Sequence, residues 1–329
     1  MKSIINRISE YISQKQKRAS RKDFLRGLVA STGAAALIKS VSPVLAGTEQ
    51  KLPPRKKRAI KTACDLAVIK GANPASATRK AVEALGGIGL FVRRGDTVVV
   101  KPNIGWDRAP EYAATTNPEV VATLIRLCRE AGAKKVMVFD RTCNEAEMCY
   151  RNSGIQEAVT RAGGHIVHVT DWKFIAGAFP EGSALESWPI YRDAVECDCF
   201  INVPIAKHHS LSGLTLSMKN LMGVCGGPRG QIHWNIDRKL PELTKFINPE
   251  LTVIDASRIL VRHGPSGGSL KDVRKTNTLI AGTDPVLADS YAATLFDRRP
   301  ADIGHLRAGE ELGVGTTNIA RASIRKISI

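Results

Sequence analysis

One stretch of the chain, from Ala206 to Gly230, gathers side chains that suit the binding of an anion. It reads AKHHSLSGLTLSMKNLMGVCGGPRG and joins a Lys-His-His run, several hydroxyls, a Lys-Asn pair and a glycine-rich exit. Lysines and a helix N-terminus hold phosphates or carboxylates, and a histidine can serve as acid, base or metal ligand. We therefore take His209 and Lys219 as the candidate catalytic residues.

The residues from about Gly213 have helical spacing. On a helix, Ser212, Thr215 and Lys219 would share a polar face beside a stripe of leucines and methionines. The free N–H groups of that helix would then point toward His209. The alternative is a packing helix whose hydroxyls bond the preceding turn. The crowding of the polar groups favours a site.

The elements that must position these side chains alternate along the chain. DTVVVKPNI (96–104) is a short β-branched run that predicts a strand. NPEVVATLIRLCREAGA predicts a helix with Asn117 as its N-cap, Pro118 in its first turn and Gly132 at its end. Strand and helix patterns continue to alternate beyond this unit. The pattern indicates an α/β fold with a mainly parallel sheet and flanking helices.

Polar residues follow several of the predicted strands. In parallel α/β sheets, ligands bind beyond the carboxyl ends of the strands. The strand ends and the opening stretch together give a predicted ligand-binding set: Lys101, Asn103, Thr116, Asp140, Asn202, Lys207, His208, Ser217, Asn220 and Asp284. In the alternative, Asp140 or Asp284 pairs with the lysines, and the cluster is a structural ion network.

The overall composition narrows the class of ligand. The formal net charge is +17, which favours anionic partners. Aromatic residues make up 5% of the chain, too few for base stacking to be expected, and no zinc-finger or RNA-recognition signature occurs. We expect an anionic small molecule as partner and no nucleic acid.

The N-terminal residues 1–46 have the pattern of a signal peptide. SRKDFLR (20–26) resembles the twin-arginine export motif, with Lys22 where a second arginine is expected. The apolar run that follows is too short to span a bilayer, and the segment ends in VLA at Ala46. We expect twin-arginine export machinery as a partner, cleavage near Ala46, a periplasmic or otherwise exported location, and no transmembrane segment in the mature chain. Ordinary secretion and an uncleaved amphipathic anchor are the alternatives.

Two further segments complete the expected organisation. Residues 47–60 contain two prolines and a cluster of basic residues, which predicts a solvated basic linker. Residues 61–329 are expected to form the α/β domain. The linker is therefore left out of the predicted fold.

Seven cysteines add less information. Cys197 and Cys199 could share a metal or form a strained disulfide, although packing in a buried strand is favoured. Cys143 and Cys149 could pair in an oxidising compartment. Cys225, beside the glycines, is the candidate for a free thiol near the site.

Four motifs occur in one order: VVVKPNIGW, TTNPEVVATLIRLCREAGAKKVMVFD, CFINVPIAKHHSLSGLTLSMKNLMGV and LIAGTDPVLADSYAA. Over about residues 60–325 the chain closely resembles the family called domain of unknown function 362. Many relatives carry a ferredoxin-like tail with the run C-x2-C-x2-C-x3-C. This chain has no such run, so the electron-transfer role of that tail is not carried over.

A shorter segment has a second, local resemblance. HSLSGLTLSMKNLMG (209–223) is similar to a segment of the nickel-pincer lactate racemase family, in which a His and a Lys ten residues apart contact the cofactor. His209 and Lys219 have the same spacing, with Gly213 and Ser217 between them. The resemblance implies a shared position of the site.

These observations predict an exported α/β protein that binds an anionic small molecule, or a phosphorylated or metal cofactor, at the ends of its strands. An enzyme of unknown reaction is the first interpretation. The alternatives are a periplasmic anion- or metal-binding protein without catalysis and an iron–sulfur-associated electron-transfer protein. The sequence identifies neither the cofactor nor a metal.

Overall fold

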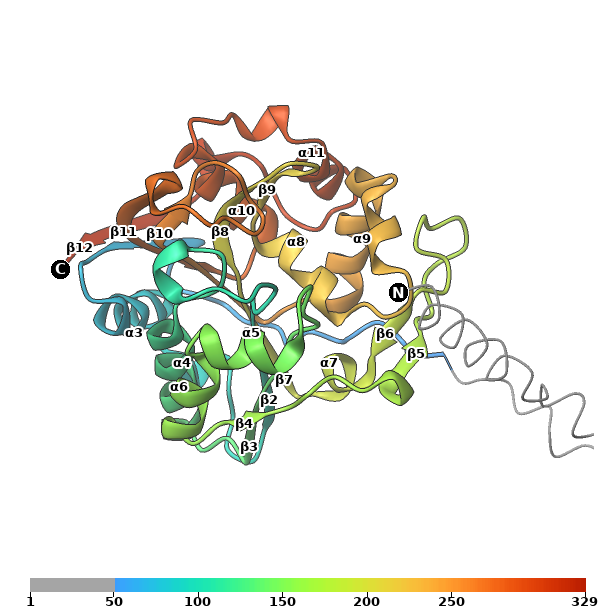
Figure 1. Ribbon diagram of the computed structural model, residues 1–329, viewed down its shortest axis with the longest axis horizontal. Helices are drawn as coiled ribbons and strands as arrows, with labels where there is room; N and C mark the ends of the chain where they lie inside the picture. Colours follow the sequence, from blue (N-terminus) through green and yellow to red (C-terminus); the bar gives the residue numbers. More distant parts are fainter. Residues whose placement is uncertain (1–50) are drawn as a thin grey trace, which may run out of the picture. The chain divides into compact units, whose positions relative to one another are not determined.

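The computed structural model describes residues 51–329, which are built around one large sheet (Figure 1). Its strands follow the order β12-β1-β11-β10-β7-β2-β3-β4, with β8 paired to β10 and β9 to β8. The strands are β1 (Leu66–Lys70), β2 (Thr97–Pro102), β3 (Lys135–Val138), β4 (His165–Ile166), β7 (Cys199–Val203), β8 (Ile205–His209), β9 (Gly213–Thr215), β10 (Leu251–Leu260), β11 (Val273–Gly282) and β12 (Ile324–Ser328). A separate small sheet joins β5 (Phe174–Ala176) to β6 (Pro189–Tyr191).

Most strand pairs in the large sheet are parallel. β2 pairs in parallel with both β3 and β7, and β10 pairs in parallel with β7 and β8. β11 runs antiparallel to its neighbours β10 and β1, and β9 runs antiparallel to β8. The predicted α/β class with a mainly parallel sheet is confirmed.

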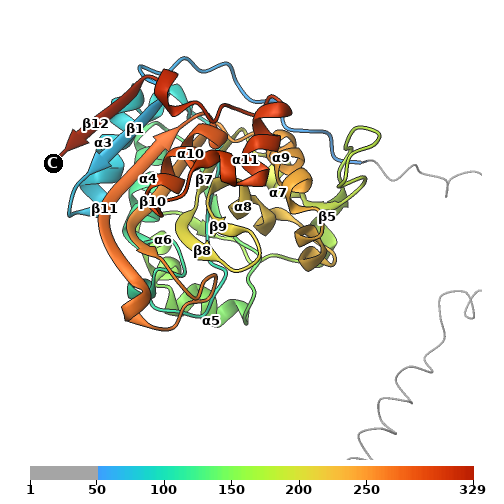
Figure 2. The same cartoon turned by 90° about the horizontal axis from the view of Figure 1, so that it is seen from above.

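Helices cover both faces of the sheet, and the side chains of each strand alternate between two apolar cores. In β2, Val99 faces one core while Val98 and Val100 face the other. Figure 2 shows α9, α10 and α11 gathered on one side of the sheet. The helices are α3 (Pro74–Leu85), α4 (Pro118–Glu130), α5 (Ala146–Asn152), α6 (Ile155–Arg161), α7 (Arg192–Glu196), α8 (Ser217–Asn220), α9 (Ile236–Ile247), α10 (Pro285–Thr294) and α11 (Gly304–Glu311).

Helix α4 begins as the sequence predicts. The Asn117 side chain accepts a hydrogen bond from the backbone N–H of Glu119 at 3.0 Å, and Pro118 lies in the first turn. The helix ends before Gly132, whose φ of 87° lies in the left-handed region that favours glycine. The predicted helix boundaries are confirmed.

The predicted helix from Gly213 is wrong, because these residues form a hairpin. β9 pairs with β8, placing Thr215 opposite Lys207 and Gly213 opposite His209. Gly213 has a φ of 74°, which lets the chain reverse there. Helix α8 begins four residues later, and a 3-10 turn over 221–224 follows it.

The described part of the predicted linker, residues 51–60, is anchored on the domain at Leu52 and Arg55, and its remaining residues are exposed or half-buried. Leu52 donates a backbone hydrogen bond to Ala176 O at 2.8 Å. The guanidinium of Arg55 is buried and forms a salt bridge with Glu250 at 3.0 Å. The prolines and basic residues suggested a solvated segment, but a buried carboxylate partner overrides that composition.

The predictions about export concern residues 1–46 and lie outside the described residues, as do residues 47–50 of the predicted linker. Within residues 51–329, every helix is too short or too polar to cross a membrane.

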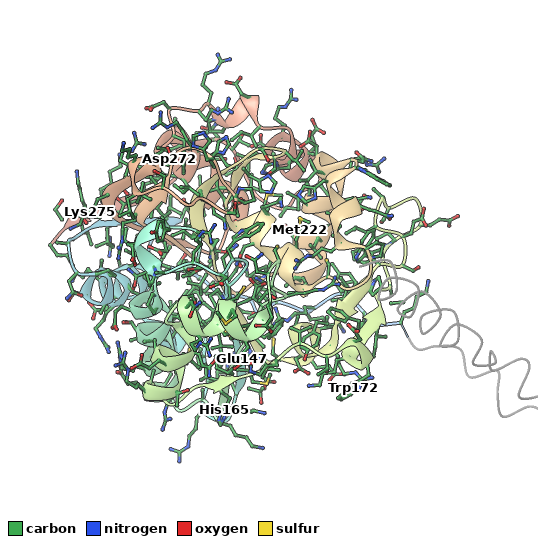
Figure 3. The ribbon with its side chains drawn as sticks, viewed as in Figure 1. Glu147, His165, Trp172, Met222, Asp272 and Lys275 are labelled. Atoms are coloured by element: carbon green, nitrogen blue, oxygen red, sulfur yellow. The ribbon has the colours of Figure 1, made fainter. Side chains whose placement is uncertain are left out.

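Figure 3 shows Met222 among the packed helices, while the exposed residues His165 and Lys275 lie at the edge of the domain.

Candidate anion-binding site

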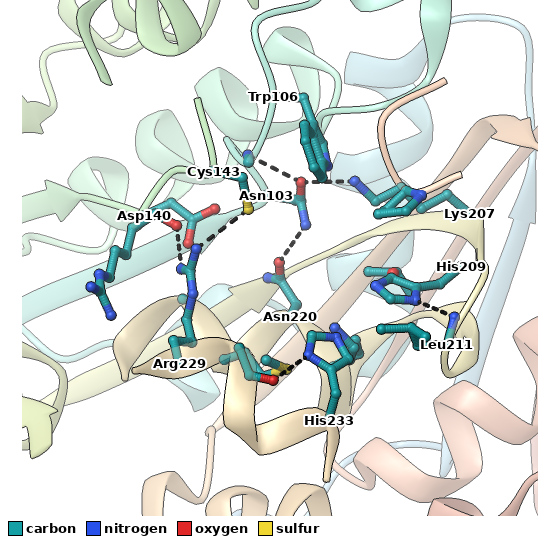
Figure 4. Close-up of a pocket in the computed structure, with 18 of the residues that line it drawn as sticks. Asn103, Trp106, Asp140, Cys143, Lys207, His209, Leu211, Asn220, Arg229 and His233 are labelled. Carbon is teal, nitrogen blue, oxygen red and sulfur yellow. Dashed lines mark hydrogen bonds between the residues drawn. The ribbon is translucent and has the colours of Figure 1, made fainter. Parts of the chain in front are cut away.

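A cavity of about 340 Å³ opens at the carboxyl ends of β2, β3 and β8 (Figure 4). These strands are mutually parallel through the sheet, so their ends meet at one edge. Backbone and side chains of four segments complete the walls: the loop after β2, the loop after β3, the β8–β9 hairpin, and the chain from α8 to the turn before α9. The main polar residues around it are Asn103, Asp140, Arg141, Cys143, Lys207, His209, Thr215, Lys219, Asn220, Arg229 and His233.

The floor of the cavity is a buried ion pair. Lys101 is fully buried, and its ammonium lies 2.8 Å from Asp140 Oδ1. Asp140 Oδ2 accepts a hydrogen bond from the backbone N–H of Ile104 at 2.7 Å. Gly223 packs against both charged groups, and a Cβ there would collide with the carboxylate. Burial lowers the pKa of Lys101, and the Asp140 carboxylate opposes that effect.

Three asparagines join the strands to helix α8. Asn103 donates to Asn220 Oδ1 at 3.2 Å, and Asn220 donates to Asn202 Oδ1 at 2.9 Å. Asn202 in turn donates to the backbone oxygen of Ser217 at 2.9 Å. These amide groups hold the start of α8 against the sheet edge, which fixes the position of Lys219.

Lys207 extends from β8 into the cavity with 1% of its surface exposed. Its ammonium donates to Ala114 O at 2.6 Å and to Asn103 Oδ1 at 3.2 Å, both of them uncharged acceptors. Burial, with the nearby ammonium groups of Lys219 and Lys101, lowers the pKa of Lys207 to about 7.

Lys219 is the cation without a partner. It is 8% exposed, and within residues 51–329 its ammonium has neither a hydrogen bond nor a carboxylate at ion-pair distance. Burial and the positive charge of Arg229 lower its pKa to about 8. An ammonium group in this position retains its full capacity to donate to a bound acceptor.

Two arginines add positive charge at the mouth. Arg229 donates to the backbone oxygens of Arg141 and Thr142 and to Cys143 Sγ, the last at 3.3 Å. Arg141 donates to Cys225 O at 2.9 Å and to Gly227 O at 3.0 Å. Asp140 is the carboxylate that lines the cavity, and Lys101 already neutralises it. The electrostatic field inside therefore favours an anion.

Two histidines of the cavity wall, His209 and His233, lie side by side with their rings stacked and the ring centroids 5.3 Å apart (Figure 4). His209 Nδ1 accepts hydrogen bonds from the backbone N–H groups of Leu211 and Ser212, so the proton of the neutral ring sits on Nε2. His233 Nδ1 lies 2.9 Å from Gly230 O, which can only accept, so here Nδ1 carries the proton. The buried Nε2 of His233 has no partner.

Both histidines are held neutral. Burial, followed by the charge of Lys219, lowers the pKa of His209 to about 3. Burial also lowers the pKa of His233. The pair therefore offers one ring N–H donor, at His209 Nε2, and one bare ring nitrogen, at His233 Nε2.

The structure brings six of the predicted site residues to the cavity wall: Asn103, Asp140, Lys207, His209, Lys219 and Asn220. Four others lie behind the wall as structural supports: Lys101, Thr116, Asn202 and Ser217. Thr116, for example, donates to Val203 O at 2.7 Å and accepts from the backbone N–H of Asn103 at 2.8 Å. His208 points away from the cavity, where its Nδ1 accepts from the backbone N–H of Gly264.

The prediction that Asp284 joins the site is wrong. β11, which precedes Asp284, is antiparallel to β10, and its last residue Gly282 pairs with Thr252 near the start of β10. The carboxyl end of β11 therefore lies at the opposite edge of the sheet. Asp284 caps helix α10 there, accepting from the backbone N–H of Leu287 at 2.8 Å.

The expected anion site at a helix N-terminus is also wrong. The N–H groups at the start of α8 already donate to a buried carboxylate: Ser217 N to Asp289 Oδ1 at 2.7 Å, and Met218 N to Asp289 Oδ2 at 3.0 Å. Burial raises the pKa of Asp289 to about 6. The N–H groups that do reach His209 come from the hairpin turn.

The predicted ligand-binding set lacks several residues of the wall: Trp106, Arg141, Cys143, Arg229 and His233. Thr215, also in the wall, enters the sequence analysis only as part of the polar face of the predicted helix. Arg229 lies in the glycine-rich exit of the opening stretch and His233 three residues beyond it, so that exit was the available signal. The Thr215 hydroxyl is buried without a partner, and the residue is 4% exposed. As the partner of Lys207 in the hairpin, it could be found once the helix had been replaced by a strand.

Cys197 and Cys199 are buried, as the favoured packing interpretation predicts. All seven cysteines are free. Cys225 is buried outside the cavity wall, and burial raises its pKa to about 12, so the thiol at the site is the exposed Cys143 instead. Within residues 51–329, no group of three or more His, Cys, Asp or Glu side chains is placed to hold a metal ion.

Comparisons with known proteins agree with this description. A model of a domain of unknown function (DUF362) matches residues 98–294. A thylakoid-associated protein of Synechocystis sp. is 28% identical over 248 residues, which is 73% of this chain and 75% of that protein. The match to the family model confirms the resemblance seen in the four motifs.

Two solved structures are similar in fold. The lactate racemase apoprotein from Thermoanaerobacterium thermosaccharolyticum matches with a TM-score of 0.44 and 14% identity, over 74% of this chain and 61% of that one. A protein from Thermotoga maritima matches with a TM-score of 0.38 and 15% identity, over 69% of this chain and 58% of that one. This chain therefore spans less than two thirds of either structure, and the similarity concerns the fold alone.

Proposed function

The chain belongs to the family described as a domain of unknown function (DUF362), and we propose that its cavity binds a small carboxylate or phosphate anion. The observation that carries this proposal is the Lys219 ammonium, which is buried without an anionic partner in residues 51–329. The neighbouring cations Lys207 and Arg229 add to the same field.

The cost of burial supports an external partner for Lys219. An unpaired buried charge costs several kcal/mol, and proteins normally pair such a group or hold it neutral. The pKa of Lys219, about 8, leaves the group mainly charged at neutral pH. Lys101 shows how this fold satisfies a buried lysine when the partner is internal, since Asp140 lies 2.8 Å away. A bound anion would supply the negative charge that Lys219 lacks.

The two histidines make proton exchange the proposed chemistry. His233 Nε2 has an unused lone pair, so it accepts a proton from the atom beside the anionic group. The neutral ring of His209, stacked beside His233, donates a hydrogen bond from Nε2 to the charge that develops. Thr215 adds a hydroxyl that can donate or accept. The protein is thus proposed to be an acid–base enzyme.

Ligand-dependent melting tests the proposed binding. Purified protein is titrated with phosphate, nucleotides and small hydroxy acids, and the melting temperature is followed. Lys219→Met should keep or raise the ligand-free melting temperature, because it removes an unpaired charge, and should lose the ligand-dependent increase. Lys275→Met, which removes an exposed lysine at the edge of the domain, should keep both. If Lys219→Met melts lower and no ligand stabilises either protein, Lys219 is a structural residue and the proposal fails.

We propose separately that the protein is exported by the twin-arginine pathway, on the basis of SRKDFLR at residues 20–26. The motif contains one of the two usual arginines, so replacing Arg21 leaves neither of them. Arg21→Lys should stop export while the protein still folds in the cytoplasm. Cell fractionation with immunodetection measures this, and normal accumulation of the variant outside the cytoplasm would disprove the pathway.

A further inference from the structure

Cys143 differs from the other cysteines in its surroundings. It is exposed, whereas the remaining six are buried. Burial raises the pKa of Cys149 to about 11 and that of Cys197 to about 12. Reactive cysteines lie in exposed, positively charged surroundings, and cysteines buried among apolar groups are inert. The surroundings of Cys143 match the reactive kind.

The position of Cys143 links the cavity to the protein surface. The residue lies in the loop after β3, and its backbone N–H donates to Gly105 O at 2.8 Å. Its sulfur accepts a hydrogen bond from Arg229 Nη2 at 3.3 Å (Figure 4). Cys143 lines the cavity and also an outer groove that ends at the exposed Trp234. A molecule bonded to this sulfur can therefore extend inward or outward.

Two unpartnered groups show that the inner part of this space is built for a ligand. Residue Lys219 is 8% exposed and residue Thr215 is 4% exposed, and both line the same cavity. The Thr215 hydroxyl is fully buried without a hydrogen-bond partner, and the Lys219 ammonium forms no hydrogen bond or ion pair within residues 51–329. Cys143 lines the same cavity as Lys207 and Lys219, and its sulfur contacts Arg229 at 3.3 Å. The thiol and the unpaired cations thus belong to one site.

We propose that Cys143 is a covalent modification site that reacts with small anionic disulfides, a preference that rests on the anion binding proposed above. The thiol first loses its proton to solvent. The thiolate then attacks one sulfur of the disulfide, a new S–S bond forms to Cys143, and the old S–S bond breaks. The second half of the reagent leaves as a thiolate with the electron pair. The attached half places its carboxylate toward Lys219 and blocks the cavity.

The experiment compares two disulfides that differ only in charge, dithiodipropionate and its uncharged diamide. Adduct formation on the full chain is followed by intact mass, and the modified cysteine is located by peptide mapping. Each rate is divided by the rate with a free small-molecule thiol. This normalised rate should be at least about tenfold higher for the dianion, as expected for electrostatic steering. Cys143→Ser should form no adduct. Equal normalised rates, or an adduct on another cysteine, would overturn the proposal.

Matched variants separate this inference from the proposed function. Lys219→Met should reduce the preference for the dianion, and Lys275→Met should not. The Cys143→Ser variant should become insensitive to dithiodipropionate. If phosphate stabilises the protein but the charge preference is absent, the modification site is wrong and anion binding stands. If the preference for the dianion is present without any stabilisation by phosphate, anion binding as proposed fails and the modification site stands.

Discussion

Two hollows at opposite edges of the sheet have similar sizes and opposite charge. The cavity around Lys219 measures about 340 Å³, and the cleft around Asp284 about 420 Å³. In the cleft, the protein itself uses the carboxylates: Asp284 accepts from the backbone N–H groups of Leu287 and Thr316, and Glu310 accepts from Thr316 and Thr317.

The difference between the two hollows lies in unused hydrogen-bonding capacity. In the cavity, the buried Thr215 hydroxyl and the buried His233 Nε2 have no partner within residues 51–329. The ammonium of Lys219, a residue that is 8% exposed, likewise forms no hydrogen bond or ion pair there. Buried polar groups in folded proteins are normally paired, so unpaired ones call for an explanation. A collection of charges at a strand end therefore does not make a site unless some of its polar atoms remain available.

The largest expected effect comes from removing the carboxylate partner of Lys101, which would leave this buried lysine unpaired, as Lys219 is. Asp140→Asn removes the carboxylate partner of Lys101 and leaves a fully buried cation, which should lower the free energy of unfolding by about 3–5 kcal/mol. Gly223→Ala should also destabilise the protein, because its Cβ would collide with the Asp140 carboxylate. Urea denaturation measures both. An Asp140→Asn variant of unchanged stability would show that the ion pair is not structural.

Lowering the pH should reduce the stability of the folded protein through protonation of His209. The pKa of this group is about 3 in the folded protein and ordinarily 6.5. Between these values the unfolded chain binds more protons, so stability falls as the pH is lowered from 6.5 toward 3, by up to about 1 kcal/mol per pH unit for a group beside water. His209→Gln should reduce this slope in urea denaturation at several pH values. His165→Gln, at an exposed histidine, serves as the control, and a slope unchanged by His209→Gln would contradict the assignment.

Raising the pH should remove positive charge from the cavity and so reduce the difference in charge between the cavity and the cleft. Lys207 and Lys219, with pKa values of about 7 and 8, lose their protons as the pH rises. Affinity for sulfate, whose charge is constant over this range, should fall at least about tenfold between about pH 6 and about pH 9, by loss of charge attraction. Isothermal titration calorimetry measures the affinity. In Lys219→Met the weaker binding that remains should follow the titration of Lys207, and pH-independent binding in the wild type would refute the role of both lysines.

The smallest effect is expected in the cleft. Asp284→Ala removes the N-cap of α10, which should cost about 1 kcal/mol of stability. Sulfate affinity should not change, because Asp284 lies at the other edge of the sheet. A marked change in anion affinity would show that the two hollows are coupled.

The sequence predicted the elements on the parallel side of the sheet well. Lys101, Asp140 and Lys207 each come at or just after the end of an apolar run, and parallel strand ends share an edge. The same rule failed at Asp284, because a run such as TNTLIAG has the same composition whether the strand is parallel or antiparallel to its neighbours. Strand direction depends on the pairing partners, which the local pattern does not contain.

The remaining parts of the site depend on contacts between distant segments. Leu214, Met218 and Leu221 fit a helical period, yet Leu214 lies in a strand because Thr215 pairs with Lys207 in the hairpin. His233 reaches His209 through irregular turns that have no periodic signature. The solvated-linker prediction failed at Arg55 for a related reason, since its partner Glu250 is 195 residues away.

The order of strands has a consequence for how the chain is made. β1, the first strand of the sheet, lies between β11 and β12, so both of its neighbours come from the last part of the sequence. While the ribosome is still producing residues 71–272, neither of the two strands that pair with β1 has been made. That half of the sheet can close only after residues 273–328 have emerged, so the native sheet is completed once these residues have been made and not segment by segment.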